Sequence, residues 1–139
     1  MRSSWHDFPV PNRDSYQPFQ VRAYADSSDP DQTLYLTLPR EGKKHPLVIF
    51  FHGGGMTGGD RECPDEIYDG RFAVAEPRYR LSPAAKAPAQ IEDAARAIAW
   101  CFTHAEELGI DRSRIFIGGM SAGSYLAAIS VMNPKFLAP

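Results

Sequence analysis

The chain has 139 residues, of which 43% are hydrophobic and 23% charged, and its formal net charge is −2. This length suits one domain with its own core, and the small net charge argues against electrostatic attraction to nucleic acid or to an anionic membrane. The longest apolar run, residues 47–51, is too short to span a bilayer, and residues 1–10 lack the apolar region of a signal peptide. These features predict a cytoplasmic protein without a membrane span, with secretion of a processed form as the alternative.

Residues 1–18 are rich in proline, aspartate, asparagine and serine, which predicts an irregular leader before a single domain at 19–139. Apolar and polar residues alternate at 19–24 and at 33–38, as they do in half-buried strands. The turn-like residues between these two segments predict that the strands form an antiparallel pair.

Residues 47–51 form a continuous apolar run (Leu-Val-Ile-Phe-Phe) between Pro46 and a cluster of glycines. Such a run favours a central strand that is buried on both faces. We expect a loop from 53 to about 70, a second short buried strand at 72–75 and a proline-rich loop at 77–88.

Residues 88–108 have the period of a helix. One face carries apolar side chains in steps of 3 and 4 residues: Ile91, Ala94, Ala95, Ile98, Cys101, Phe102, Ala105 and Leu108. Glu92 and Arg96 fall on the opposite face. Pro88 suits the first turn of a helix, and Gly109 suits the position just past its end.

A turn at residues 111–113 is followed by a third buried strand, predicted at 114–117, and by a helix at 121–132 that Pro134 ends. Strands that alternate with helices are typical of an α/β fold. The expected architecture is a mainly parallel sheet with helices on both faces.

Gly119-Met120-Ser121-Ala122-Gly123 is a G-x-S-x-G sequence between an apolar strand and a helix. A sharp turn at this place strains the central residue and lifts its side chain clear of the sheet, where a serine can act as a nucleophile. A Cβ at Gly119 or Gly123 would collide with the neighbouring strand or helix. The alternative is a tight turn in which Ser121 only caps the helix.

His52-Gly53-Gly54-Gly55 directly follows the longest apolar run. Consecutive glycines can turn their N–H groups into a pocket that receives the oxyanion of a tetrahedral intermediate. A flexible loop or a phosphate-binding loop is the alternative. Phosphate is disfavoured because residues 118–124 have no lysine before the serine, and no G-x-G-x-x-G follows a strand.

The two motifs together are more specific than either alone. A strand followed by HGGG, and then a strand-GxSxG-helix segment, is the order found in α/β-hydrolases of the lipase and esterase type. In this order of motifs the chain resembles the α/β-hydrolase-3 group and is similar to hormone-sensitive-lipase-like carboxylesterases and bacterial acetyl esterases. Residues 77–83 (PRYRLSP) resemble the YRLAP segment of that group, and residues 93–100 resemble its D-x-x-x-A-x-x-W helix. The resemblance covers about residues 33–133 and implies the α/β-hydrolase fold.

The resemblance also implies roles for single residues. Ser121 is the nucleophile, and the oxyanion donors are the backbone N–H groups of three residues: Gly53, Gly54 and Ala122. His52 orients the glycine loop rather than acting as the base. Met120 stands where an acid is usual and Ser124 where a second glycine is common, so acetyl or feruloyl esterases that act on polysaccharides and have a similar fold stay open.

No Asp, Glu or His follows Ser121 in the sequence, although in this fold the triad acid and histidine come after the serine. The earlier histidines are poor substitutes: His52 belongs to the loop, whereas His6, His45 and His104 lie in or beside loops or point outward from the long helix. We therefore expect the N-terminal half of an α/β-hydrolase domain, truncated after the helix of the nucleophile. Without a base for its serine, this chain alone is expected to be inactive.

The predicted function is a serine carboxylic-ester hydrolase, lipase-like and acting on short acyl or acetyl esters, with no cofactor and no metal. The two cysteines, Cys63 and Cys101, lack the spacing of a metal or redox site and are expected to be reduced thiols. A non-catalytic module for binding or assembly, or a serine peptidase of the same fold, is the alternative. An unpaired strand at 114–117 and an apolar final helix predict a homo-oligomer or association with a missing C-terminal half.

Overall fold

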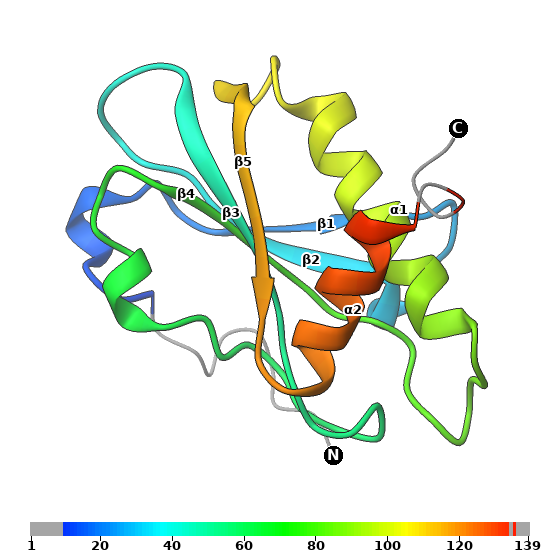
Figure 1. Ribbon diagram of the computed structural model, residues 1–139. Helices are drawn as coiled ribbons and strands as arrows, with labels where there is room; N and C mark the ends of the chain where they lie inside the picture. Colours follow the sequence, from blue (N-terminus) through cyan, green and yellow to red (C-terminus); the bar gives the residue numbers. More distant parts are fainter. Residues whose placement is uncertain (1–9, 134, 136–139) are drawn as a thin grey trace.

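The computed structural model describes residues 10–133 and 135. Its centre is a five-stranded sheet in the order β1-β2-β4-β3-β5 (Figure 1). The strands are β1 (Gln20–Ala23), β2 (Thr33–Thr37), β3 (His45–Phe51), β4 (Ala73–Pro77) and β5 (Ile110–Gly119). Because β2 pairs antiparallel with β1 and β4, whereas β3 pairs parallel with β4 and β5, every strand except β2 runs in one direction. The mainly parallel sheet and the antiparallel opening pair are as predicted.

The two α-helices, α1 (Ala89–His104) and α2 (Ala122–Met132), cover the same face of the sheet (Figure 1). Alternate residues of β3 point to opposite faces, so Leu47, Ile49 and Phe51 pack into a core with these helices. Val48 and Phe50 pack on the other face with Tyr16 and with Tyr68. Helices were expected on both faces, but the described residues have no α-helix on this second face, where the segments around the 3-10 helices η2 (Arg13–Ser15) and η4 (Asp65–Ile67) lie instead.

Of the predicted leader (residues 1–18), the structure describes residues 10–18. Tyr16, just after η2, is buried and forms an isolated antiparallel bridge with Pro39. Its hydroxyl donates to the carbonyl of Phe72 (3.0 Å). Residues 10–18 are therefore attached to the sheet although they form no strand, and residues 1–9 lie outside the described part. A further short 3-10 helix, η3 (Pro30–Gln32), leads into β2.

The helix α1 is shorter than predicted, but its last turn keeps helical hydrogen bonds. The N–H of Leu108 donates to the carbonyl of His104 (3.1 Å) beyond the end of regular helix. Gly109, with a φ of +71°, then closes the turn, and the next N–H, of Ile110, donates to the carbonyl of Ala105 (2.8 Å). This is a Schellman-type helix end, in which a glycine with positive φ lets the following N–H groups bond to the last helical carbonyls.

The strand β5 differs from the prediction in length and in burial. It begins at Ile110, before the predicted turn at residues 111–113, which is an irregularity inside the strand. There the Asp111 carboxylate accepts from the N–H and the hydroxyl of Ser113. The prediction of a buried strand was wrong: Phe116 is 54% exposed. Among the described strands β5 pairs with β3 alone, so its side chains lack neighbours on the second edge.

None of the helices in the described residues is long and apolar enough to cross a membrane. Cys63, in the loop after β3, and Cys101, on α1, are both buried free thiols. Burial raises the pKa of Cys101 to about 12, so this thiol is protonated at neutral pH.

Candidate active site

The two glycine motifs leave the sheet side by side. β3 and β5 are parallel neighbours, and their last residues, Phe51 and Gly119, are paired in register. The N–H of Met120 also donates to the carbonyl of Phe51 (3.1 Å). Carboxyl ends of adjacent parallel strands are the usual place for sites in α/β sheets. The topology therefore brings His52 and its glycines next to Ser121.

Ser121 lies between β5 and α2 in a strained backbone conformation. Its φ is +51° and its ψ is −115°, a region that residues other than glycine rarely adopt. It occupies the N-cap position of α2, but its hydroxyl makes no capping hydrogen bond and its side chain is exposed. The geometry thus disfavours the alternative in which Ser121 serves only as a helix cap.

Close backbone approaches explain the two glycines that flank Ser121. A Cβ on Gly119 would lie 2.4 Å from the carbonyl carbon of Gly123. A Cβ on Gly123 would lie 1.9 Å from the carbonyl oxygen of Phe51, at the end of β3. Any side chain at either position would push α2 away from the sheet, and Ser121 would move with the helix.

The glycine loop touches the serine directly. A Cβ on Gly53 would lie 2.8 Å from the carbonyl oxygen of Met120 and 3.3 Å from the Cβ of Ser121. Gly54 has a φ of +119°, and its carbonyl accepts from the N–H groups of Thr57 and Gly58. The absence of side chains at these glycines lets the loop backbone approach Ser121.

One backbone N–H of this loop faces a carboxylate. The N–H of Gly53 donates to Oε1 of Glu62, an exposed residue further along the same loop. Within the described residues, the N–H groups of Gly54 and Ala122 have no hydrogen-bond acceptor. Sequence reasoning missed Glu62 because no motif or periodicity distinguishes it from the other acidic residues of the loop.

His52 is buried, and its interactions hold the start of the glycine loop. Its Nδ1 lies 2.7 Å from the carbonyl oxygen of Gly53. Its ring stacks on the ring of Tyr79, with the centroids 4.4 Å apart. The Tyr79 hydroxyl donates to the His52 carbonyl at 2.6 Å. This arrangement is compatible with the orienting role predicted for His52, and it adds Tyr79, which sequence reasoning used only as part of a family resemblance.

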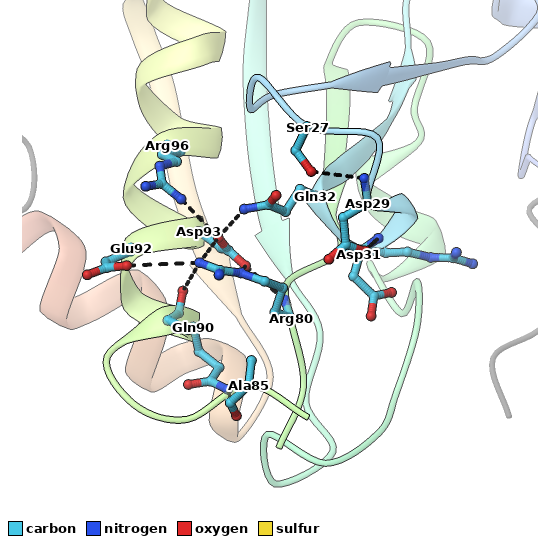
Figure 2. Close-up of polar contacts among 12 residues, drawn as sticks. Ser27, Asp29, Asp31, Gln32, Arg80, Ala85, Gln90, Glu92, Asp93 and Arg96 are labelled. Carbon is cyan, nitrogen blue, oxygen red and sulfur yellow. Dashed lines mark hydrogen bonds and ion pairs between the residues drawn. The ribbon is translucent and has the colours of Figure 1, made fainter. Parts of the chain in front are cut away.

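Tyr79 lies between two anchored arginines. On one side, Asp93 of α1 is fully buried and accepts from the backbone N–H and the guanidinium of Arg80 at 2.9 Å, and also from the Gln32 amide (Figure 2). The hydrogen bond with Asp93 raises the pKa of Arg80. Glu92 and Arg96 lie at the outer side of this cluster (Figure 2).

The other arginine, Arg78, is held through both its side chain and its backbone. Its guanidinium pairs with Asp60 at 2.7 Å in a buried ion pair. Its carbonyl accepts from the Tyr24 hydroxyl at 2.6 Å. Burial raises the pKa of Tyr24, so the phenol keeps the proton that it donates. Residues 78–80 are therefore fixed on both sides of Tyr79.

The described histidines other than His52 lie away from the serine. His45 begins β3 and pairs with Ile110, at the end of the strand opposite to the glycine loop. His104 ends α1 and stacks on Trp100, with the centroids 4.2 Å apart. His6 lies outside the described residues. Within the described part of the chain, the Ser121 hydroxyl has no hydrogen-bond partner, and no group of three or more His, Cys, Asp or Glu could hold a metal ion.

Known proteins similar to this chain are esterases and lipases. Residues 34–135 match the family described as BD-FAE. The chain is 40% identical over 97 residues to the carboxylic ester hydrolase LipN of Mycobacterium tuberculosis. This match covers 66% of this chain and 26% of that protein. It is 33% identical over 131 residues to Lipase 2 of a Moraxella species, covering 91% of this chain and 28% of the lipase.

Solved structures agree with these relatives. Esterase B from Lactobacillus rhamnosis superposes with a TM-score of 0.76 and 31% identity, over 91% of this chain and 41% of that one. A bacterial heroin esterase superposes with a TM-score of 0.71 and 34% identity, over 84% of this chain and 40% of the esterase. The chain spans 26–28% of the length of the two curated relatives named above and less than half of these structures.

Proposed function

Since this chain belongs to the BD-FAE family and has the α/β-hydrolase fold of its esterase relatives, we propose that it provides the nucleophile and the oxyanion hole of a serine carboxylic-ester hydrolase. Ser121 is the nucleophile in this proposal. The names of the relatives, which are esterases, lipases and carboxylic ester hydrolases, support esters as the substrate class over peptides.

The conformation of Ser121 is the observation that carries the proposal. The Ser121 carbonyl accepts from the N–H of Tyr125 (3.2 Å), but its strained backbone carries a hydroxyl that makes no capping bond to the helix. The same strain presents the hydroxyl at the carboxyl end of the sheet, against a loop of glycines. A module that only binds or assembles would gain nothing from this strain, so the geometry favours the enzyme over a non-catalytic module.

The proposed chemistry is acyl transfer. The Ser121 Oγ attacks the ester carbonyl, its proton passes to a base, and the carbonyl oxygen becomes an oxyanion. This oxyanion accepts from the N–H groups of Gly53, Gly54 and Ala122. When the intermediate collapses, the bond to the leaving oxygen breaks and this oxygen takes the proton from the base, so the alcohol departs. Water then attacks the acyl-enzyme, which releases the carboxylic acid and restores the Ser121 hydroxyl. Because Glu62 is the present acceptor of the Gly53 N–H, the substrate oxygen must displace this carboxylate.

The base and its acid partner are not found beside Ser121 among the described residues. His52 is the one described histidine in the glycine loop, and its Nδ1 already faces the Gly53 carbonyl. In this fold the triad acid and histidine follow the serine along the chain, and no Asp, Glu or His follows Ser121, so we propose that both come from polypeptide beyond this sequence. The 139-residue chain alone is then expected to hydrolyse esters very slowly and to react poorly with fluorophosphonate probes.

The decisive experiment compares two serines of the same motif in a full-length protein. Ser121→Ala should lower hydrolysis of p-nitrophenyl acetate by about 10³-fold or more, as loss of a triad member does. Ser124→Ala is the control, because the Ser124 hydroxyl donates to the Gly119 carbonyl at 2.6 Å and is not the proposed nucleophile. Near-normal activity of Ser121→Ala would refute the proposal, as would a fluorophosphonate adduct on any other residue.

The same assay tests the acyl preference. We propose short acyl or acetyl esters as substrates, following the resemblance to acetyl esterases. A higher kcat/KM for p-nitrophenyl acetate or butyrate than for the dodecanoate would agree with this preference, whereas the reverse order would contradict it.

A further inference from the structure

The peptide bond between His52 and Gly53 has a different partner at each end. Its carbonyl, from His52, accepts from the Tyr79 hydroxyl at 2.6 Å. Its N–H, from Gly53, donates to the Glu62 carboxylate, on the side of Gly53 that faces Ser121. A trans peptide unit is planar and its C=O and N–H point in opposite directions. Whatever fixes the carbonyl therefore also fixes the direction of the N–H.

We propose that Tyr79 is a positioning residue for the oxyanion hole, which acts by holding the His52–Gly53 peptide so that the Gly53 N–H points toward the oxyanion. This inference rests on the proposed function, because it gives Tyr79 a role in the reaction that Ser121 begins. Tyr79 does not touch the substrate. It acts through a peptide plane whose far side is the donor.

Tyr79 is suited to this role because it cannot easily move. Its side chain is fully buried, and its ring is stacked almost parallel on the His52 ring, with 10° between the planes. Asp93 holds the backbone N–H of the next residue, Arg80, at 2.9 Å (Figure 2). Asp60 holds the side chain of the preceding residue, Arg78. The hydroxyl is thus presented to the His52 carbonyl from a rigid base.

The Glu62 contact supports the direction assigned to the N–H. A carboxylate oxygen carries negative charge, as does the oxyanion of a tetrahedral intermediate. The Gly53 N–H is held toward such an oxygen on the side where Ser121 lies. The donor thus already points to an anion when no substrate is bound, which is what a preorganised oxyanion hole requires.

The test compares two buried tyrosines in a full-length protein. Tyr79→Phe removes the hydroxyl bonded to His52 and keeps the ring. Tyr16→Phe removes the hydrogen bond from the buried Tyr16 hydroxyl to the Phe72 carbonyl (3.0 Å), on the opposite face of the sheet and away from Tyr79. Both changes delete a hydrogen bond from a buried phenol to a backbone carbonyl, and Tyr16→Phe also removes the acceptor of the Gly70 N–H, so Tyr16→Phe is expected to lower the melting temperature at least as much as Tyr79→Phe.

Only Tyr79→Phe should affect the transition state. We expect kcat to fall about tenfold, less than the 10²- to 10³-fold cost of losing an oxyanion donor, because the N–H is misdirected rather than removed. KM should change less than about twofold, and the affinity for a trifluoromethyl ketone that mimics the oxyanion should fall about as much as kcat/KM. Rates are normalised to the fraction of enzyme that fluorophosphonate titrates, so loss of folded protein does not enter.

Two results would overturn the inference: an unchanged kcat in Tyr79→Phe, or an equal fall of kcat in both variants, since the second would mean general destabilisation. Failure of the proposed function is distinguishable from either result. It would be seen as retained activity in Ser121→Ala, whatever Tyr79→Phe does.

Discussion

Two parts of the molecule meet at Ser121, and different interactions hold them in place. We call the glycine loop (52–55) with its supporting residues 78–80 the loop wall, and the end of β5 with α2 the serine wall. The wall that carries the glycine loop is fixed by buried polar contacts: Asp93 with Arg80, Asp60 with Arg78, and Tyr79 with the His52 carbonyl. The wall that carries the serine is fixed by contact distances that leave no room for a Cβ at Gly119 or Gly123. Hydrogen bonds and ion pairs fix the position of the loop wall, whereas close backbone contacts fix the position of the serine wall.

The walls also differ in how completely the described residues cover them. In the loop wall, Asp93 and Tyr79 are fully buried, and their polar groups have partners within the chain. In the serine wall, apolar side chains of β5 and α2 are exposed, among them Phe116, Tyr125, Val131 and Met132. The residues that support the glycine loop are therefore buried within the described chain, whereas the serine wall has apolar surface available for further contacts.

The largest effect is expected from steric intrusion into the serine wall. In Gly123→Ala, the new Cβ would lie 1.9 Å from the Phe51 carbonyl oxygen, so α2 must move off the sheet. We expect the free energy of unfolding to fall by about 4 kcal/mol or more, in the range reserved for severe structural conflicts. Urea unfolding followed by circular dichroism measures this loss.

Gly58→Ala is the matched control, because no atom lies within 4 Å of a Cβ at Gly58. Its stability should stay within about 0.5 kcal/mol of the unmodified chain. If the two alanine variants were equally stable, the serine wall would not depend on steric exclusion.

A smaller effect is expected from breaking the polar contacts of the loop wall. Asp93→Asn keeps the shape of the side chain but removes the negative charge that accepts from four nitrogen donors of Arg80 and Gln32, each at 2.9 Å. Breaking a buried ion pair from one side costs about 3 kcal/mol or more. The midpoint of urea unfolding should fall accordingly.

Glu92→Gln is the matched control for this substitution. Glu92 precedes Asp93, faces Arg80 at 3.9 Å, and its side chain is 47% exposed. A contact of this kind contributes at most about 1 kcal/mol. A loss in Glu92→Gln as large as that in Asp93→Asn would mean that burial does not distinguish the two carboxylates.

The sequence predicted the parts of the site that depend on local pattern. The apolar run before His52 and the glycines around Ser121 are signals that a few adjacent residues carry, and the structure has a strand and a sharp turn at these places. The alternation of strands and helices predicted a mainly parallel sheet, and β3 and β5 do pair in parallel. That these two strands are neighbours, which places the two motifs side by side, was not predicted, because the alternation does not fix the strand order.

The parts that escaped prediction depend on contacts between distant segments. Nothing near Asp93 in the sequence says that its carboxylate is buried against Arg80, and the helical period left it a polar position on α1. Glu62 reaches Gly53 only because the loop folds back on itself. The exposure of β5 was mispredicted for a related reason, since an apolar strand is buried only if neighbours cover it.

The smallest effect on stability, and the sharpest test of the open wall, is expected from charging the exposed end of α2. Met132 is 80% exposed and Val131 51% exposed, so burial of these side chains contributes little to the fold of the described chain. Their burial against another polypeptide would contribute about 1.5–3 kcal/mol each. We therefore expect the 139-residue chain to self-associate at tens of micromolar or to bind a polypeptide that covers the exposed side chains of α2.

Light scattering should give a mass above 15.4 kDa for the unmodified chain. The double variant Val131→Lys, Met132→Lys should shift the mass toward the monomer, while the free energy of unfolding changes by less than about 0.5 kcal/mol. Lysines at Asp26 and Ser27, exposed positions in the turn after β1, provide the control and should leave the mass unchanged. A monodisperse monomer of the unmodified chain would show that the apolar surface of α2 does not drive association.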